Sequence, residues 1–205
     1  MSAPLIFIAE TLFELYVLCF VLRFVLQATR ADFHNPLSQL IVRVTNPVVL
    51  PLRRLVPGFR GLDMSSLIVV LVLEVVATAV LFPLKTGVSP SPAGLLYFAL
   101  LRTMMTVLRM YMFAVLIYAL MSFVNPGTYN PLTSVLASIS EPLLRPVRRI
   151  IPPIAGLDLS PLFVIIGLQA LMLAEAVGLG GHVTGLDISP QFLAYGERFA
   201  EQAGL

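Results

Sequence analysis

Residues 35–67 read NPLSQLIVRVTNPVVLPLRRLVPGFRGLDMSSL, and residues 130–162 repeat this stretch as NPLTSVLASISEPLLRPVRRIIPPIAGLDLSPL. The two copies align without a gap at an offset of 95 residues and are identical at 13 of 33 positions. Most of the identical residues are Asn, Pro, Arg, Gly, Asp or Ser. A repeat of this length predicts that the chain contains two copies of one structural unit.

The composition around the repeat is that of a membrane protein. Hydrophobic residues make up 58% of the 205 residues and charged residues only 12%, and the mean hydropathy is +0.94. Soluble domains carry about 25% charged residues. About 20 apolar residues in a helix cross the hydrocarbon core of a bilayer. Four segments are long and apolar enough to be predicted spans: 4–28, 64–84, 95–124 and 159–179.

We therefore predict an all-α polytopic membrane protein with four transmembrane helices in two parallel two-helix repeats. Within each repeat loop, prolines bound two short amphipathic stretches, at 36–45 and 47–56 in the first copy. We expect these stretches to be short interfacial helices in the headgroup layer. The predicted units are the first repeat at 1–94 with its loop at 29–62, the second repeat at 95–180 with its loop at 125–158, and an amphipathic tail at 181–205.

The GLDxS phrase closes each loop and predicts the start of the next span. Asp and Ser side chains can cap the free N–H groups of a first helical turn, which must be satisfied before a helix enters hydrocarbon. A third copy of the phrase lies in the tail, at residues 185–189. The predicted caps are Asp63, Ser65, Asp158, Ser160, Asp187 and Ser189.

Arginine placement predicts the orientation in the membrane. The two repeat loops contain Arg30, Arg43, Arg53, Arg54, Arg60, Arg145, Arg148 and Arg149. The opposite side has Lys85 and Arg198. The positive-inside rule therefore places both loops in the cytoplasm and both termini outside. Both repeats then insert the same way up, unlike the inverted repeats of many secondary transporters.

Several ionisable residues interrupt the predicted spans, and each is a candidate for function because a charge in hydrocarbon is costly. They are Glu10, Glu14, Arg23, Glu74, Arg102, Arg109 and Glu175. The repeat offset places Glu14 and Arg109 at equivalent positions, so we predict a buried ion pair at one depth between the repeats. Three roles stay open for these residues: structural pairing between spans, a proton or ion pathway, or contact with a partner or an aqueous cleft.

The sequence carries no signature of catalysis. It lacks a nucleophile with a histidine base, an HExxH motif, a CxxC motif and a glycine-rich phosphate loop. The single cysteine is Cys19, and the histidines His34 and His182 have no second ligand at metal-binding spacing. We expect no enzyme activity, no catalytic residues, no metal and no cofactor.

The motifs NPL, PLRRLVP/PVRRIIP and GLDxS in both halves resemble the YggT family of small bacterial and plastid membrane proteins, over about residues 5–180. This resemblance implies a four-helix integral membrane protein with two repeats and no established reaction. It also implies a loose association with cell division or envelope organisation, with osmotic stress tolerance and, in plastids, with nucleoid distribution and cytochrome complex maturation.

The expected function is that of a non-enzymatic scaffold or assembly factor in the bacterial inner membrane. Its cytoplasmic loops would contact anionic lipid headgroups or an acidic partner. The expected contact residues are Arg53, Arg54, Arg145, Arg148 and Arg149. A membrane-protein partner or a second copy of the chain is expected, and direct binding of nucleic acid is not. The alternative is a component of a transport or osmoadaptation system that uses the charges within the spans.

Overall fold

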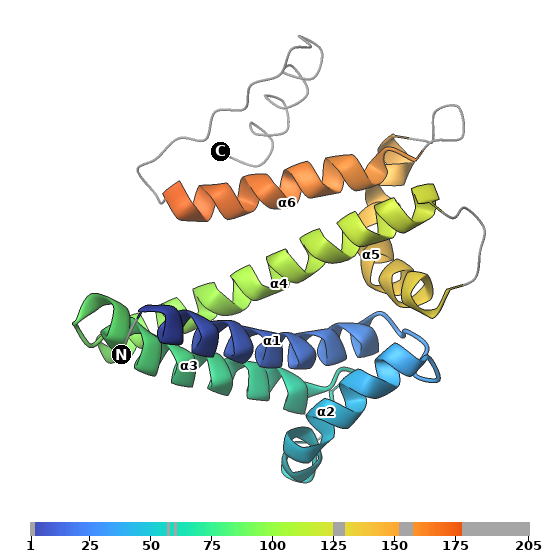
Figure 1. Cartoon of the computed structure of the whole chain (residues 1–205). Coiled ribbons are helices and arrows are strands. Elements are labelled where there is room, and N and C mark those ends of the chain that lie inside the picture. Colours follow the sequence, from blue (N-terminus) through green and yellow to red (C-terminus); the bar gives the residue numbers. More distant parts are fainter. Residues whose placement is uncertain (1–2, 57, 60, 125–129, 152–157, 178–205) are drawn as a thin grey trace. The chain divides into compact units, whose positions relative to one another are not determined.

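The computed structural model describes residues 3–56, 58–59, 61–124, 130–151 and 158–177, and the secondary-structure elements of these residues are helices (Figure 1). The chain divides into a body, Met1–Leu168, and a C-terminal unit that begins at Gln169, and each is considered by itself. The helices are α1 (Ala3–Ala28), α2 (Pro36–Arg53), α3 (Met64–Thr86), α4 (Pro92–Val124), α5 (Pro131–Ile150) and α6 (Ser160–Val177). The predicted all-α class is thus confirmed for the described residues. The predicted tail helix at 181–205, with Asp187 and Ser189, lies outside them.

Three helices of the described chain are long and apolar enough to cross a membrane. They are Pro4–Ala28 in α1, Met64–Thr86 in α3 and Pro92–Ser122 in α4. These three agree with the first three predicted spans, and α1, α3 and α4 pack against one another. The fourth predicted span corresponds to α6, which is apolar but shorter.

The amphipathic segments of the loops differ from the prediction. Each forms one continuous helix, α2 or α5, instead of two short ones. Both helices run through their internal prolines, which are Pro47 and Pro51 in α2 and Pro142 and Pro146 in α5. A proline removes the hydrogen bond to the carbonyl four residues earlier. All four prolines lie on the exposed side of their helix, where a carbonyl without its helical partner can be hydrated, so the helix continues.

An asparagine begins each of these helices, and sequence reasoning had missed its role. The side chains of Asn35 and Asn130 accept hydrogen bonds from the backbone N–H of Leu37 and Leu132, both at 2.9 Å. Proline follows at the first helical position, where its missing N–H costs nothing. The Asn35 side chain also donates to the carbonyl oxygen of Pro131 at 2.7 Å, which joins the starts of α2 and α5.

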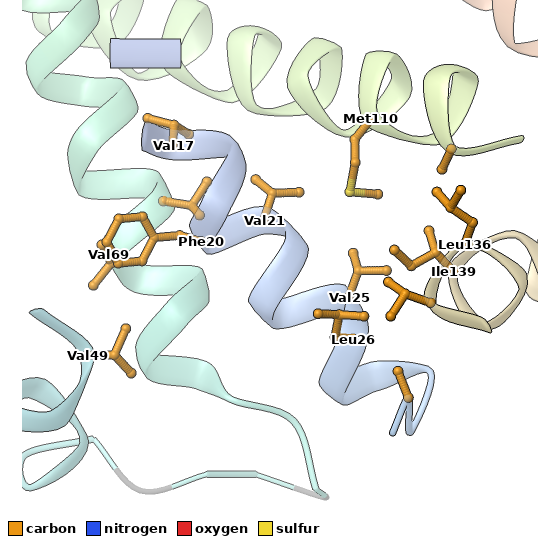
Figure 2. Close-up of a cluster of buried hydrophobic side chains, with 14 residues drawn as sticks. Val17, Phe20, Val21, Val25, Leu26, Val49, Val69, Met110, Leu136 and Ile139 are labelled. Atoms are coloured by element: carbon orange, nitrogen blue, oxygen red, sulfur yellow. The ribbon is translucent and has the colours of Figure 1, made fainter. Parts of the chain in front are cut away.

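Helix α1 supplies the centre of the main hydrophobic core. Its buried residues Val17, Phe20, Val21, Val25 and Leu26 contact α2, α3, α4 and α5 (Figure 2). A second, smaller cluster contains Val115, Leu144, Val164 and Leu168. The first three of these are the equivalents, at the offset of 95, of Phe20, Val49 and Val69 in the main core. The same three positions of the repeat therefore contribute to the core of each copy.

Candidate functional site

The first of two charged clusters lies where α3 begins. Asp63 Oδ2 accepts hydrogen bonds from Arg23 Nε at 3.3 Å, from Arg53 Nη2 at 2.6 Å and from the Ser66 hydroxyl at 2.9 Å. Arg23 Nη1 also donates to Thr45 Oγ1 at 2.8 Å and to Asn46 Oδ1 at 2.9 Å. This first-repeat cluster, formed by Arg23, Thr45, Asn46, Arg53, Asp63 and Ser66, links α1, α2 and the start of α3.

The two charges at the centre of the first-repeat cluster are almost completely shielded from solvent. Arg23 is 4% exposed and Asp63 is 2% exposed. Burial by itself raises the pKa of the Asp63 carboxyl, but hydrogen bonds from Arg53 and Ser66 and the charges of both arginines hold that pKa below its ordinary value. Asp63 therefore stays ionised at neutral pH, and its charge balances part of the buried positive charge.

The equivalent second-repeat cluster contains Glu141, Arg145, Arg148 and Asp158. Arg148 Nε donates to Asp158 Oδ2 at 2.8 Å, which reproduces the pairing of Arg53 with Asp63. Arg148 Nη1 also donates to Glu141 Oε2 at 2.8 Å, and Arg145 Nε donates to Glu141 Oε1 at 3.4 Å. Three residues differ in kind from the first copy: Tyr118 stands at the position of Arg23, Glu141 at that of Asn46 and Arg145 at that of Leu50.

The arginine pairs predicted to contact lipid or a partner divide into two classes. The first arginine of each pair, Arg53 or Arg148, is held by an aspartate of the same chain. The second, Arg54 or Arg149, is exposed, and its side chain makes no ion pair with any described residue. Arg43 is also exposed and makes no ion pair with any described residue, and it was not among the predicted contact residues.

The predicted helix-start caps have different roles from those expected in the first copy. Asp63 precedes α3 but makes no side-chain capping bond, because its carboxylate is occupied by arginine and serine side chains. The Ser65 hydroxyl donates to the carbonyl oxygen of Val56 at 3.0 Å. In the second copy, Asp158 Oδ1 accepts from the backbone N–H of Ser160 at 3.0 Å, next to the start of α6.

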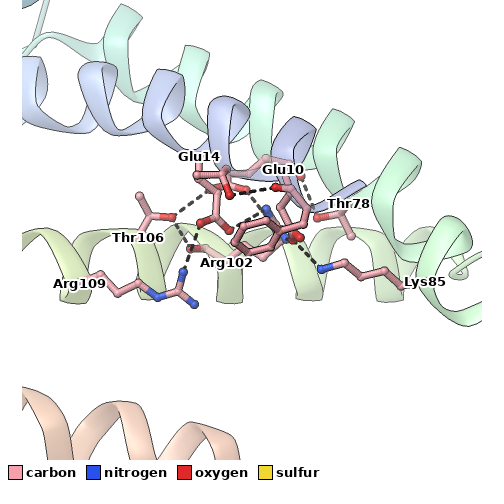
Figure 3. A network of polar contacts seen from close by, with 10 residues as sticks. Glu10, Glu14, Thr78, Lys85, Arg102, Thr106 and Arg109 are labelled. Atoms are coloured by element: carbon pink, nitrogen blue, oxygen red, sulfur yellow. Dashed lines mark hydrogen bonds and ion pairs between the residues drawn. The ribbon is translucent and has the colours of Figure 1, made fainter. Parts of the chain in front are cut away.

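The second charged cluster lies within the predicted spans and joins α1, α3 and α4. Arg102 contacts three carboxylates: Glu74 at 3.0 Å, Glu10 at 3.4 Å and Glu14 at 3.5 Å. Lys85 contacts Glu10 at 2.6 Å. We call this set the intramembrane network (Figure 3), and its charged members are Glu10, Glu14, Glu74, Lys85, Arg102 and Arg109. Three carboxylates face three cations, so the network carries no net formal charge.

Glu74 is the deepest group of the intramembrane network. It is only 1% exposed, and its second oxygen accepts a hydrogen bond from the Thr106 hydroxyl at 3.2 Å. Arg102 was predicted only as an isolated charge, and Lys85 only as a topology signal. Their convergence on the same carboxylates depends on the packing of three helices, and no local sequence pattern reveals it.

The predicted partners Glu14 and Arg109 are in contact, with 3.4 Å between Arg109 Nη1 and Glu14 Oε2. The pair is not buried within the chain, because the two side chains are 37% and 51% exposed. Both residues line a groove of about 330 Å³ between α1, α4 and α5, whose walls are otherwise mostly apolar. The prediction of contact is correct, and the prediction of burial is wrong because this groove opens beside the pair.

Two other predicted positions lie apart from the intramembrane network. Arg23 belongs to the first-repeat cluster. Glu175 is within α6, but its side chain is outside the described residues. Among the described side chains, no group of three or more metal-ligating residues could hold a metal ion.

Replacing Asp63 with Asn should destabilise the protein more than replacing Asp158 with Asn. Asp63 is buried and forms ion pairs with two arginines. Breaking a buried pair costs about 3–5 kcal/mol. Asp158 is partly exposed, so its loss should cost about 1 kcal/mol. Thermal unfolding of detergent-purified protein at neutral pH measures both, and equal losses would contradict the assigned roles.

Asp63 should also make stability depend on acid pH. Its folded-state pKa lies below the ordinary value, so its contribution is complete above that value, about 3.9, and is lost as pH falls further through the folded-state pKa. The melting temperature of the Asp63→Asn variant should therefore fall less between about pH 5 and about pH 3 than that of the unaltered protein.

Glu14→Leu should lower thermal stability more than Arg109→Leu. Removing Glu14 leaves Arg109 without a charged partner among the described residues, whereas removing Arg109 leaves Glu14 in contact with Arg102. We expect a loss of about 1–3 kcal/mol for Glu14→Leu, and a double variant whose loss is smaller than the sum of the single ones. Additive losses in detergent-purified protein would show that the contact contributes nothing.

Comparison with known proteins adds the family. The family model described as CCB3/YggT matches residues 2–84 and again residues 97–177, so its two matches correspond to the two halves of the chain. No solved structure matches the chain.

Three relatives show the extent of the similarity. An uncharacterized protein of Pseudomonas aeruginosa is 41% identical over 83% of this chain and 87% of its own length. A Vibrio alginolyticus protein named for its position in the proC 3′ region is 42% identical, over 80% of this chain and 88% of its own. The Escherichia coli K12 protein named "Uncharacterized protein YggT" is 35% identical, over 84% of this chain and 89% of its own. The chain therefore belongs to the CCB3/YggT family.

Proposed function

We propose that this protein is a non-enzymatic scaffold or assembly factor of the bacterial inner membrane, with α1, α3, α4 and α6 as its spans and both basic loops in the cytoplasm. The observation that supports the proposal is that some charges of the protein are paired with one another and others are exposed without a partner among the described residues. The charges of the intramembrane network are matched to one another, whereas Arg43, Arg54 and Arg149 are exposed and unpaired within the described chain.

The fourth span is part of this proposal. Helix α6 has 18 residues, which at 1.5 Å each gives about 27 Å and suits a thin or locally compressed bilayer. Two spans, α3 and α4, separate the loop that contains α2 from the loop that contains α5. An even number of spans returns the chain to its starting side, so these two loops share one face. The excess of arginine in those loops supports a cytoplasmic position for that face.

The intramembrane network supports a structural role. Arg102 on α4 connects Glu10 and Glu14 on α1 with Glu74 on α3, so removing any one of these groups leaves a net charge in a low-dielectric region. A set of charges that satisfy each other fixes the rotation and depth of three helices. A rigid helical core with free arginines at one face suits a protein that recruits or positions others.

A transport role is the second candidate, and the groove beside Glu14 and Arg109 is the observation that favours it. Reconstituted into vesicles, a scaffold should give no flux of protons, Na⁺ or K⁺ above that of protein-free vesicles. A transporter should give flux that falls on Glu74→Gln, a substitution that removes one charge of the balanced network. Flux abolished by Glu74→Gln in correctly folded protein would replace the scaffold proposal.

The free arginines provide the direct test of the scaffold proposal. A variant with Arg54→Lys and Arg149→Lys should insert and fold normally but fail to rescue the phenotype of a strain that lacks the gene. A planar guanidinium binds phosphate and carboxylate groups through two parallel hydrogen bonds, and lysine cannot reproduce this geometry. Full rescue by this variant would reduce the two arginines to topology signals.

The matched control carries Arg53→Lys and Arg148→Lys, which alters the arginines that bind Asp63 and Asp158. This control should lower thermal stability, whereas the Arg54/Arg149 variant should not. Insertion is checked with single cysteines beside Arg54, Arg149 and Ser89, after Cys19 has been replaced. An impermeant thiol reagent applied to intact cells should label only the cysteine beside Ser89.

A further inference from the structure

The first-repeat cluster holds more positive than negative charge. Arg23 and Arg53 share one oxygen of Asp63, at 3.3 Å and 2.6 Å. The other polar contacts of Arg23 in the cluster are neutral groups of Thr45 and Asn46. Two guanidinium groups and one carboxylate leave a formal charge of +1 beneath the end of α2.

The second-repeat cluster is neutral. Arg148 lies 2.8 Å from both Asp158 and Glu141, and Glu141 also contacts Arg145 at 3.4 Å. Two cations and two carboxylates leave no formal charge. The difference arises at three positions of the repeat, because the second copy has Tyr118 in place of Arg23, Glu141 in place of Asn46 and Arg145 in place of Leu50.

The exposed surface at α2 also carries more unpaired positive charge than the exposed surface at α5. Arg43 on α2 and Arg54, which directly follows the last residue of α2, are both exposed and lie 11 residues apart, which is three turns or about 16 Å in a regular helix. Arg53 uses Nη2 for Asp63, and its side chain is still 43% exposed, so other N–H donors remain accessible. On α5 the equivalent of Arg43 is Ser138, whose hydroxyl donates to the carbonyl oxygen of Ser134.

We propose that α2 of the first repeat is the binding surface for the phosphate groups of anionic lipid headgroups, through Arg43, Arg53 and Arg54. On α5, Glu141 pairs with Arg145 and Arg148 and thereby prevents the equivalent surface from binding these phosphate groups. Guanidinium groups bind phosphate through paired, charge-assisted hydrogen bonds. The uncompensated charge of Arg23 and Arg53 adds to the attraction, because it lies behind the surface in a region where screening is weak. The inference rests on the proposed function in one respect: α2 must face an anionic leaflet.

Native mass spectrometry of the detergent-purified full chain, titrated with phosphatidylglycerol or with zwitterionic phosphatidylcholine, tests this proposal. Arg43→Ala with Arg54→Ala should weaken phosphatidylglycerol binding about tenfold or more, since each basic group near anionic lipid contributes about a factor of five. Arg145→Ala with Arg149→Ala removes the same number of arginines from the α5 segment, and it should change that affinity less than about twofold. Phosphatidylcholine binding should be the same for all variants.

A reciprocal exchange tests the role assigned to the acidic residue. Glu141→Asn gives α5 the residue that α2 has at Asn46, and it should add phosphatidylglycerol binding. Asn46→Glu should remove binding from α2. Melting temperatures without lipid identify any variant that fails to fold, and Glu141→Asn remains decisive if Asn46→Glu does so. Inorganic phosphate at millimolar concentration should not displace the lipid. Displacement would instead identify a site for free phosphate.

Equal losses from the α2 and α5 arginine pairs, or no gain from Glu141→Asn, would overturn the proposal. These outcomes are measured on purified protein and are separate from rescue of the deletion strain. An α2 double variant that loses lipid binding but rescues the strain would contradict the recognition role under the proposed function and leave the lipid surface intact. A variant that keeps lipid binding would contradict the lipid surface alone.

Discussion

The ion pair between the end of each amphipathic helix and the start of the following helix is the interaction on which the rest of the structure depends. It occurs as Arg53 with Asp63 and as Arg148 with Asp158, at 2.6 Å and 2.8 Å. Each pair fixes the end of α2 or α5 next to the start of α3 or α6. The same contact occupies one arginine of each repeated pair and leaves its neighbour free at the surface.

The two copies keep this contact and change what surrounds it. Arg23 at the first aspartate is replaced by Tyr118 in the second copy, and Asn46 by Glu141. The intramembrane network shows the same divergence, because Glu14 and Arg109 are equivalent residues of opposite charge that contact each other. A duplicated unit can therefore carry complementary charges at equivalent positions of its two copies.

The charges within the spans are costly unless they find partners, and here Arg102 provides partners for three carboxylates. An apolar contact tolerates small rotations of a helix, whereas a charge placed in a low-dielectric region does not. The network therefore specifies how α1, α3 and α4 are rotated against one another. Hydrophobic packing of Phe20 and its neighbours contributes contact area between helices with less directional preference.

Sequence alone determined the all-α class of the described residues, the repeat, the approximate positions of α1 and α3 and the contact between Glu14 and Arg109. These features follow from local hydropathy, from helix length and from the repeat offset, none of which requires knowledge of side-chain packing. Only the tertiary structure decided that α2 and α5 continue through their prolines, because that outcome depends on which side of each helix is exposed. It also decided the partners of Arg53, Asp63 and Arg102, since these residues are far from some of their partners in the chain. Which charges meet depends on the rotation and crossing of helices, and a linear sequence does not specify these directly.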